Sequence, residues 1–336
     1  MRAARRTTPV VLIGAVALLA AACGSSTSAA SGSNGTQLSL VAYSTPQAAY
    51  TQLIKAFQAT PAGKGVTFKQ SYGASGDQSR AVASGLRADV VAFALEPDIT
   101  RLVKANLVDA GWNTGPTKGM VTDSVVVIGT RKGNPKNIRT WDDLAKPGVE
   151  VLTPNPFTSG GARWNVMAAY GAQSAKGAQD AKGLAYLNSL FHNVPVQDDS
   201  GRKSLQTFTQ GKGDAFLSYE NEAIFAQKKG QPVDYTIPDS TLLIENPIAV
   251  TKASEQPAKA KAFVDFLLTP AAQKIFADNG YRPVVDGIPG HDFPKPTGLF
   301  TIQDLGGWSS VTTKFFDPQK GALVGVEREL GVSVKK

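Results

Sequence analysis

The chain has 336 residues, of which 42% are hydrophobic and 18% charged, which is the composition of a globular protein long enough for two domains. Its net charge of +8 is spread without a dense stripe of Lys and Arg interleaved with aromatic residues, so nucleic acid is excluded as the expected partner. One cysteine, Cys23, and two histidines exclude an intrachain disulfide and a thiolate metal cluster, and they leave little for zinc binding or imidazole catalysis. We therefore expect no metal and no cofactor.

The first 36 residues are expected to be a leader and a tether. Residues 1–6 are basic, and residues 10–22 form an apolar run that ends in small residues and is too short for a comfortable membrane span. Cys23 follows directly, in a pattern that resembles a bacterial lipobox, where the signal peptide 1–22 is removed and a lipid is attached to the cysteine sulfur. Residues 23–36 are then a lipid-anchored flexible linker rich in Ser, Gly and Ala. The alternative is an ordinary secretory signal that happens to contain a cysteine.

The folded body is predicted to alternate strands and helices from residue 37 onward. Apolar runs predict strands over 38–43, 66–70 and 89–93, each followed by a helix, over about 46–57, 79–85 and 97–104. Ser44 or Thr45 as N-cap, with Pro46 in the first turn, is a good start signal for the first helix. This alternation indicates an α/β fold with a largely parallel sheet.

The second part of the body continues the same pattern. Further strands are expected over 124–130, near 194–196, over 215–218 and over 242–250, and further helices from 141, from 164 to about 191, after 200, over 258–267, over 270–279 and within 318–336. The chain is predicted to leave a first lobe near 124–132 and to return to it near 239–250. We therefore expect two α/β lobes with a ligand cleft between them, a discontinuous lobe I of residues 37–127 and 240–336 and a lobe II of residues 128–239.

Four places in the sequence share one design, in which a strand ends, a small polar turn follows and a helix starts. They are the turns at 44–46, 73–76, 158–161 and 200–202. Ligands of open α/β sheets bind at the carboxyl ends of strands, and each helix start adds about +0.5 charge and uncovered N–H groups. If the first two turns face the last two across a cleft, they make an anion site without any charged side chain.

The turn Thr158-Ser-Gly-Gly161 carries the strongest signal of the four. Its two glycines let the backbone approach a ligand closely. No lysine follows them, as a nucleotide-binding P-loop would require, and their spacing is not that of a dinucleotide fingerprint. The alternative is a glycine-rich turn that only reverses the chain.

Several segments together resemble the sulfate- and thiosulfate-binding proteins of ABC importers. The resemblance runs from about residue 38 to 316, and within the family it points to the lipid-anchored sulfate-binding lipoproteins of actinobacteria. The motif Pro-Asn-Pro-x-x-Ser-Gly-Gly-Ala-Arg-Trp-Asn at 154–165 is highly specific. It is supported by Leu-Val-Ala-Tyr-Ser-Thr-Pro-Gln at 40–47, Tyr-Gly-Ala-Ser-Gly-Asp-Gln-Ser at 72–79, Thr-Arg-Lys-Gly-Asn-Pro-Lys at 130–136, Pro-Gly-Val-Glu-Val at 147–151 and Tyr-Glu-Asn-Glu-Ala at 219–223.

The resemblance implies a type II periplasmic-binding-protein-like fold and a set of ligand-binding residues. Main-chain N–H groups are expected from Ser44, Ser159, Gly160, Gly161 and Gly201, and a hydroxyl donor from Ser75. Tyr219 stands where some family members have a tryptophan donor, a departure that affects the detailed ligand preference. Arg163 and Arg202 are expected just behind the ligand, bonded to backbone carbonyls and polarising the donors.

The function that the resemblance implies is extracytoplasmic capture of sulfate and its delivery to a membrane ABC permease. The protein would be a monomer, anchored to the membrane through Cys23, and would perform no chemistry on its ligand. Alternatives of the same class are receptors for thiosulfate, molybdate or phosphate. An extracellular serine hydrolase that uses Ser75 or Ser159 and a structural surface adhesin are the alternatives of other classes. Locally, Ser75 as a plain N-cap and Asp77 as a ligand-side acceptor also stay open.

Overall fold

The computed structural model describes residues 35–334, so the expected signal peptide, Cys23 and most of the linker lie outside the described residues. Within that range, no helix is both long enough and apolar enough to cross a membrane. The described part begins with strand–helix units in the order β1 (Gln37–Tyr43), α1 (Gln47–Gln58), β2 (Thr67–Gly73), α2 (Ser75–Ala83), β3 (Val90–Ala92), α3 (Glu96–Lys104) and β4 (Met120–Arg131).

The middle of the chain contains more helices than strands. It consists of α4 (Trp141–Leu144), β5 (Val151–Leu152), α5 (Gly160–Gln173), α6 (Asp180–His192), α7 (Gly201–Thr209), β6 (Ala215–Tyr219), α8 (Glu220–Lys228) and β7 (Val233–Thr236). The last part consists of β8 (Ser240–Val250), α9 (Pro257–Leu267), α10 (Pro270–Asp278), β9 (Gly298–Phe300), a 3₁₀ turn (Ile302–Leu305), α11 (Gly307–Phe316) and α12 (Ala322–Glu329).

The strands form a mixed nine-stranded sheet with the order β2-β1-β3-β8-β4-β6-β5, to which β7 adds on β4 and β9 on β8. Four strand pairs are parallel and four antiparallel, and every antiparallel pair involves β4 or β8. The expectation of a largely parallel sheet was therefore wrong. The sheet is mixed because β8 runs antiparallel to both β4 and β3. The spacing of apolar residues within a segment does not reveal which strands pair or in which direction.

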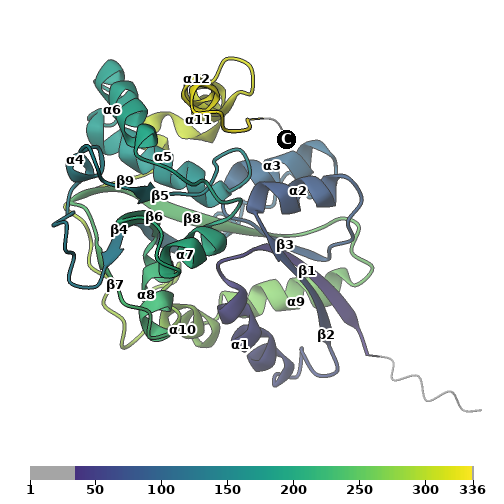
Figure 1. The fold of residues 1–336 in the computed structure, drawn as a ribbon. Helices are drawn as coiled ribbons and strands as arrows, with labels where there is room; N and C mark the ends of the chain where they lie inside the picture. Colours follow the sequence, from purple (N-terminus) through teal and green to yellow (C-terminus); the bar gives the residue numbers. More distant parts are fainter. Residues whose placement is uncertain (1–34, 335–336) are drawn as a thin grey trace, which may run out of the picture. The chain divides into compact units, whose positions relative to one another are not determined.

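Helices cover both faces of the sheet because successive side chains of a strand point in opposite directions (Figure 1). In β1, Leu38, Leu40 and Ala42 pack with α1, α9 and α10, whereas Val41 packs with α2 and α3. The same alternation occurs in β4. These strands therefore read as continuous apolar runs rather than as alternating patterns.

Strands β4 and β8 are the long elements that connect the two halves of the sheet. The first part of β4 pairs with β8, and its second part, from Val126 to Arg131, pairs with β6 and β7. In the same way β8 pairs in turn with β9, β4 and β3. These two strands lie where the sequence predicts that the chain leaves and re-enters the first lobe.

The segment from Gly298 to Val334 packs against the middle of the chain. Side chains of α11 and α12 share one hydrophobic core with α5 and α6, and Trp308 packs edge-on against Trp164 with 4.7 Å between ring centroids. In Figure 1, α11 and α12 lie beside α6 and α5. Residues 298–334, which the sequence predicts in lobe I, thus share a core with α5 and α6, which it predicts in lobe II.

Several local expectations need correction. Helix α1 starts after Pro46 without a side-chain cap, so neither Ser44 nor Thr45 is its N-cap. Helix α2 starts at Ser75 rather than at residue 79, and its N-cap position is Ala74, so Ser75 is not a plain cap. No strand forms over 194–196, and the predicted long helix to 191 is two helices. Strand β7 and helix α8 were not predicted.

A pair of acidic residues lies across the two long strands. Asp123 on β4 is directly opposite Glu245 on β8, an arrangement that is unfavourable when both are charged. Burial, together with the charge of Glu245, raises the pKa of Asp123 to about 8, although Arg282 acts to lower it. Arg282 is held here by two backbone hydrogen bonds of 2.8 Å with Asp123, while its guanidinium Nε donates to Glu220 at 2.7 Å.

We predict that the stability of the protein falls as the pH rises because of Asp123. The pKa of Asp123 is higher in the folded state than in the unfolded state. Asp123 therefore contributes its full stabilisation below its ordinary pKa of 3.8, and this contribution is lost as the pH rises through about 8. Asp123→Asn removes this titration. The free energy of unfolding of the variant, relative to that of the wild type, should therefore rise by roughly 1–3 kcal/mol from acidic to mildly alkaline pH. Urea unfolding at a series of pH values measures this difference.

Asp286→Asn is the matched control because Asp286 lies on the exposed loop after Arg282. It should track the wild type at every pH. A constant offset between Asp123→Asn and the wild type from acidic to alkaline pH would contradict the prediction.

Candidate functional site

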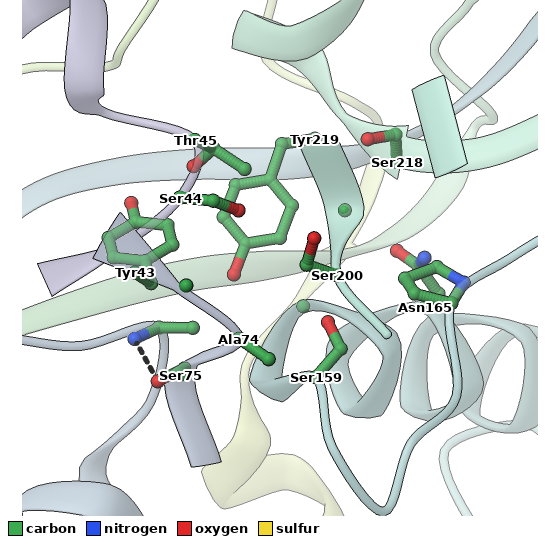
Figure 2. A pocket seen from close by; sticks show the side chains of 15 residues that line it. Tyr43, Ser44, Thr45, Ala74, Ser75, Ser159, Asn165, Ser200, Ser218 and Tyr219 are labelled. Carbon is green, nitrogen blue, oxygen red and sulfur yellow. Dashed lines mark hydrogen bonds between the residues drawn. The ribbon is translucent and has the colours of Figure 1, made fainter. Parts of the chain in front are cut away.

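A small cavity lies where the starts of several helices meet (Figure 2). The cavity has a volume of about 20 Å³, measured as the space open to the centre of a water molecule. It therefore fits a small ion and not a sugar or a nucleotide. Its lining comes from segments far apart in the chain and carries no Asp, Glu, Lys, Arg or His. The lining residues are Tyr43, Ser44, Thr45, Gly73, Ala74, Ser75, Ala94, Pro154, Ser159, Gly161, Asn165, Ser200, Gly201, Ser218 and Tyr219.

Four helices begin at this cavity. The first residue of α2 is Ser75, α5 has Ser159 as its N-cap, α7 has Ser200 and α8 has Tyr219. The N–H groups in the first turn of a helix have no partner within the helix, and each helix start carries about +0.5 charge. The cavity is therefore electropositive although its side chains are neutral.

The hydroxyl of Ser75 is already engaged within the protein. It donates to Asp98 Oδ2 at 2.6 Å and accepts from the N–H of Ala94 at 2.9 Å, the bond drawn in Figure 2. The hydroxyl hydrogen of Ser75 is thus used within the protein, because the buried carboxylate of Asp98 is a strong acceptor. The main-chain N–H of Ser75, at the first position of α2, makes no hydrogen bond to another described residue.

Ser159 has the opposite arrangement. Its main-chain N–H, which we expected to face the ligand, donates to the carbonyl of Asn155 at 2.9 Å. Its hydroxyl caps α5 by accepting from the N–H of Ala162 at 3.3 Å, and its own hydrogen stays available as a donor. The groups that make no donor bond to the described residues are therefore the main-chain N–H of Ser75 and the hydroxyl hydrogen of Ser159, whereas the expected donors are the hydroxyl of Ser75 and the main-chain N–H of Ser159.

The two glycines after Ser159 differ in their surroundings. Gly161 lines the cavity, and a Cβ there would contact the ring of Tyr219 at 3.4 Å. Gly160 does not line the cavity; a Cβ at this position would meet the side chain of Leu95 at 2.4 Å and that of Ala94 at 2.8 Å. Gly160 therefore allows α5 to pack closely on the segment after β3.

The remaining predicted residues are brought together as expected. Ser44, Gly201 and Tyr219 all line the cavity, and Gly201 is the first residue of α7, close to the side chain of Thr45. The ring of Tyr43, which the sequence did not single out, lies 6.3 Å from that of Tyr219. Six of the seven predicted ligand residues thus surround one space.

Tyr219 supplies a buried hydroxyl that lacks a partner. Its side chain is 2% exposed, and its hydroxyl makes no hydrogen bond with any described residue. Burial raises the pKa of Tyr219 well above its ordinary value, so the phenol stays neutral and keeps its hydrogen. A buried hydroxyl without a partner costs free energy, and a ligand that accepts its hydrogen recovers this cost.

Both predicted arginines contact backbone carbonyls near the cavity without lining it. Arg163 Nε donates to the carbonyl of Pro156 at 2.9 Å. Arg202 Nη2 donates to the carbonyl of Thr45 at 2.8 Å, and its guanidinium forms a two-pronged ion pair with the buried Glu222. These bonds match the expected contacts, whereas the polarising role stays a prediction.

Three further polar residues of the lining were not among the predicted ligand residues: Asn165, Ser200 and Ser218. Asn165 Nδ2 donates to Thr153 Oγ1 at 3.0 Å and to the carbonyl of Leu217 at 2.9 Å, while its buried Oδ1 has no partner among the described residues. Ser200 carried a usable signal, since it begins the fourth polar turn, and Asn165 is the last residue of the motif at 154–165. Ser218 carried none, because it lies inside a strand.

Two residues considered in the sequence lie elsewhere. Asp77 forms an ion pair with Arg80 on the exposed side of α2 and does not line the cavity, so it is not an acceptor on the ligand side. Neither histidine lines the cavity: His192 ends α6 with an exposed side chain, and His291 Nε2 lies 3.0 Å from a carboxylate oxygen of Asp278.

Comparisons with known proteins agree with this geometry. Residues 38–282 match the family model of bacterial extracellular solute-binding proteins. The sulfate-binding protein of Synechococcus elongatus is 44% identical over 316 residues, covering 90% of each chain. The thiosulfate-binding protein of Escherichia coli is 35% identical over 269 residues, covering 76% of this chain and 79% of the relative.

The solved structure of the sulfate-binding protein SubI from Mycobacterium tuberculosis H37Rv has 47% sequence identity and a TM-score of 0.82, covering 84% of this chain and 100% of that one. The fold is thus periplasmic-binding-protein-like, of type II, as the resemblance implied. The chain belongs to the bacterial extracellular solute-binding proteins, and among them to the family of the sulfate- and thiosulfate-binding proteins of ABC importers.

Proposed function

We propose that this protein captures sulfate outside the cytoplasm and delivers it to the permease of an ABC importer. The observation that carries the proposal is a cavity sized for a small ion, at which four helices begin and whose lining has no ionised side chain. The names of relatives with up to 44% identity over nine tenths of the chain support it.

The donors expected to hold the ligand come from backbone and side chains together. The structure favours the N–H of Ser75, the hydroxyl of Ser159, the N–H groups of Gly161 and Gly201, and the hydroxyl of Tyr219. A hydrogen bond to a charged group contributes roughly 1.5–3 kcal/mol, so several neutral donors together offset the desolvation of a dianion. Ser44 also lines the cavity, and Gly160 acts through packing.

Hydrogen phosphate and thiosulfate are the competing ligands. Sulfate carries no proton at neutral pH, whereas hydrogen phosphate needs an acceptor, and an unpaired buried donor costs about 1–3 kcal/mol. Asn165 Oδ1 is an unpartnered acceptor in the lining and is the observation that favours phosphate as a second candidate. Thiosulfate is supported by the 35% identical relative.

We infer that the protein binds its ligand without transforming it. The relatives are binding proteins, Ser75 Oγ is held by Asp98, and neither histidine lies at the cavity to activate Ser75 or Ser159. A nucleophilic serine needs such a base within hydrogen-bond reach. The arrangement therefore supports a receptor over a serine hydrolase.

We further propose that the cavity closes between two lobes that are linked by β4 and β8. Residues 37–127 and 240–297 would form lobe I, and residues 128–239 lobe II. The common core of Gly298–Val334 with α5 and α6 favours placing this last segment with lobe II, although the sequence predicts it in lobe I. The protein would work as a monomer.

The test of the function is calorimetric titration of the protein with sulfate, thiosulfate, molybdate and phosphate. We expect 1:1 binding of sulfate in the low micromolar range or tighter, and phosphate weaker by at least about 100-fold. Thermal unfolding should shift upward with sulfate, because a ligand that binds only the folded state stabilises it. Tight phosphate binding without sulfate binding would overturn the proposal.

Tyr219→Phe should weaken sulfate binding by roughly 10- to 100-fold, because it removes one donor to a charged ligand. It should leave the stability of the ligand-free protein unchanged or slightly raised, since the hydroxyl has no partner there. Tyr50→Phe is the matched control, because the Tyr50 hydroxyl is also buried without a partner but lies in a core away from the cavity. Equal sulfate affinity of the two variants would exclude Tyr219 as a donor.

We propose that a lipid on Cys23 anchors the protein to the outer face of the cell membrane, on the basis of the leader sequence. Cys23→Ser should move the protein from the membrane fraction of the producing bacterium to the soluble extracytoplasmic fraction. Fractionation followed by immunoblotting measures this shift. A variant that stays in the membrane fraction would contradict lipid attachment at Cys23.

A further inference from the structure

A groove between α3 and α11 is separate from the ligand cavity, with which it shares no lining residue. Measured in the same way, the volume of the groove is about 540 Å³ and that of the ligand cavity about 20 Å³. One wall is a face of α3 and the other is a face of α11, and Arg163 of α5 completes the lining. The groove is thus large enough for a small organic or inorganic molecule.

Three cationic side chains line this groove: Arg101, Lys104 and Arg163. Of these, Arg101 has a carboxylate partner, Asp98, at 2.9 Å. Lys104 and Arg163 form no ion pair with any described residue. The carboxylate in the lining is Glu96, at the other end of α3. The cationic end of the groove therefore carries positive charge that the protein does not neutralise.

Arg163 is held in a position that favours an anion. Its guanidinium makes one hydrogen bond, from Nε to the carbonyl of Pro156, and lies over the ring of Phe316 at 4.7 Å from the centroid. Burial and the positive charges of Arg101 and Arg80 lower the pKa of Arg163 to about 10, although the charge of Asp98 acts to raise it. An anion between these cations would relieve their repulsion.

Hydroxyl groups on the opposite wall add neutral donors. Ser309, Thr312 and Thr313 line the groove from α11, and the buried Oγ1 of Thr312 has no partner among the described residues. A guanidinium fork together with an ammonium and hydroxyl groups is a donor set that suits tetrahedral oxyanions.

We propose that the groove between α3 and α11 is a second anion-binding site, for a small molecule that carries a phosphate or sulfate group. The group would contact Arg101, Lys104 and Arg163, and the rest of the molecule would extend along the groove toward Pro97 and Trp308.

The second site is connected to the ligand cavity by a short chain of hydrogen bonds. Arg101 Nη1 donates to Asp98 Oδ1 at 2.9 Å, and Asp98 Oδ2 accepts from Ser75 Oγ at 2.6 Å. An anion in the groove competes with Asp98 for Arg101 and adds negative charge near the cavity. The two anions should therefore weaken each other's binding reciprocally, by about 3- to 10-fold at physiological salt. This coupling rests on the proposed sulfate function, whereas the binding site itself does not.

The experiment titrates pyrophosphate and phenyl phosphate, at constant ionic strength, into the protein with and without saturating sulfate. Both probes are too large for the ligand cavity, so we expect 1:1 binding in both conditions, in the micromolar to low millimolar range, and weaker with sulfate present. Binding of only one probe still supports the site and identifies its ligand as an inorganic anion or as an ester.

Lys104→Gln should weaken binding of the probe by at least about 5-fold and leave sulfate affinity within about 2-fold. Lys64→Gln is the matched control, because Lys64 is also exposed, loses the same charge and lies away from the groove. Absence of binding by both probes up to about 5 mM, or an equal effect of the two substitutions, would overturn the proposal. Failure of sulfate to bind would refute the proposed function alone, since the sulfate-free titration still reports on the groove.

Discussion

The proposed function imposes one constraint on the structure, which is that a doubly charged anion has to leave water and enter a cavity whose lining contains no opposite charge. Desolvating an ion costs several kcal/mol or more, and a single neutral hydrogen bond offsets only part of that cost. The fold meets the constraint by bringing the starts of α2, α5, α7 and α8 to one point. Everything that positions these four helices therefore contributes to ligand binding.

Some charged side chains near the cavity do not line it but form hydrogen bonds with residues that do. Arg202 is paired with Glu222 and donates to the carbonyl of Thr45, and Asp98 holds the hydroxyl of Ser75 while it accepts from Arg101. Such pairs fix the direction of the neutral groups that face the ligand without presenting a full charge to it.

Much of the site was predictable because its elements are local. A strand, a polar turn and a helix start leave a clear pattern in the sequence, and the segment around Ser159 carries a specific family motif. The donor atoms were not predictable: whether Ser75 or Ser159 offers a hydroxyl depends on Asp98 and Asn155, whose positions follow from tertiary packing. The direction of β8 and the place of the C-terminal segment are long-range properties in the same way, and periodicity does not contain them.

The packing of α11 on α5 has a consequence for how substitutions far from the cavity act. The indole of Trp164, which donates to the carbonyl of Ala94, is covered by Trp308, and Phe157 packs against Phe316. The glycine turn at the cavity lies between Phe157 and Trp164 in the chain, so its position depends on these two aromatic contacts. A substitution that loosens α11 therefore disturbs the cavity lining, although α11 contributes no residue to that lining.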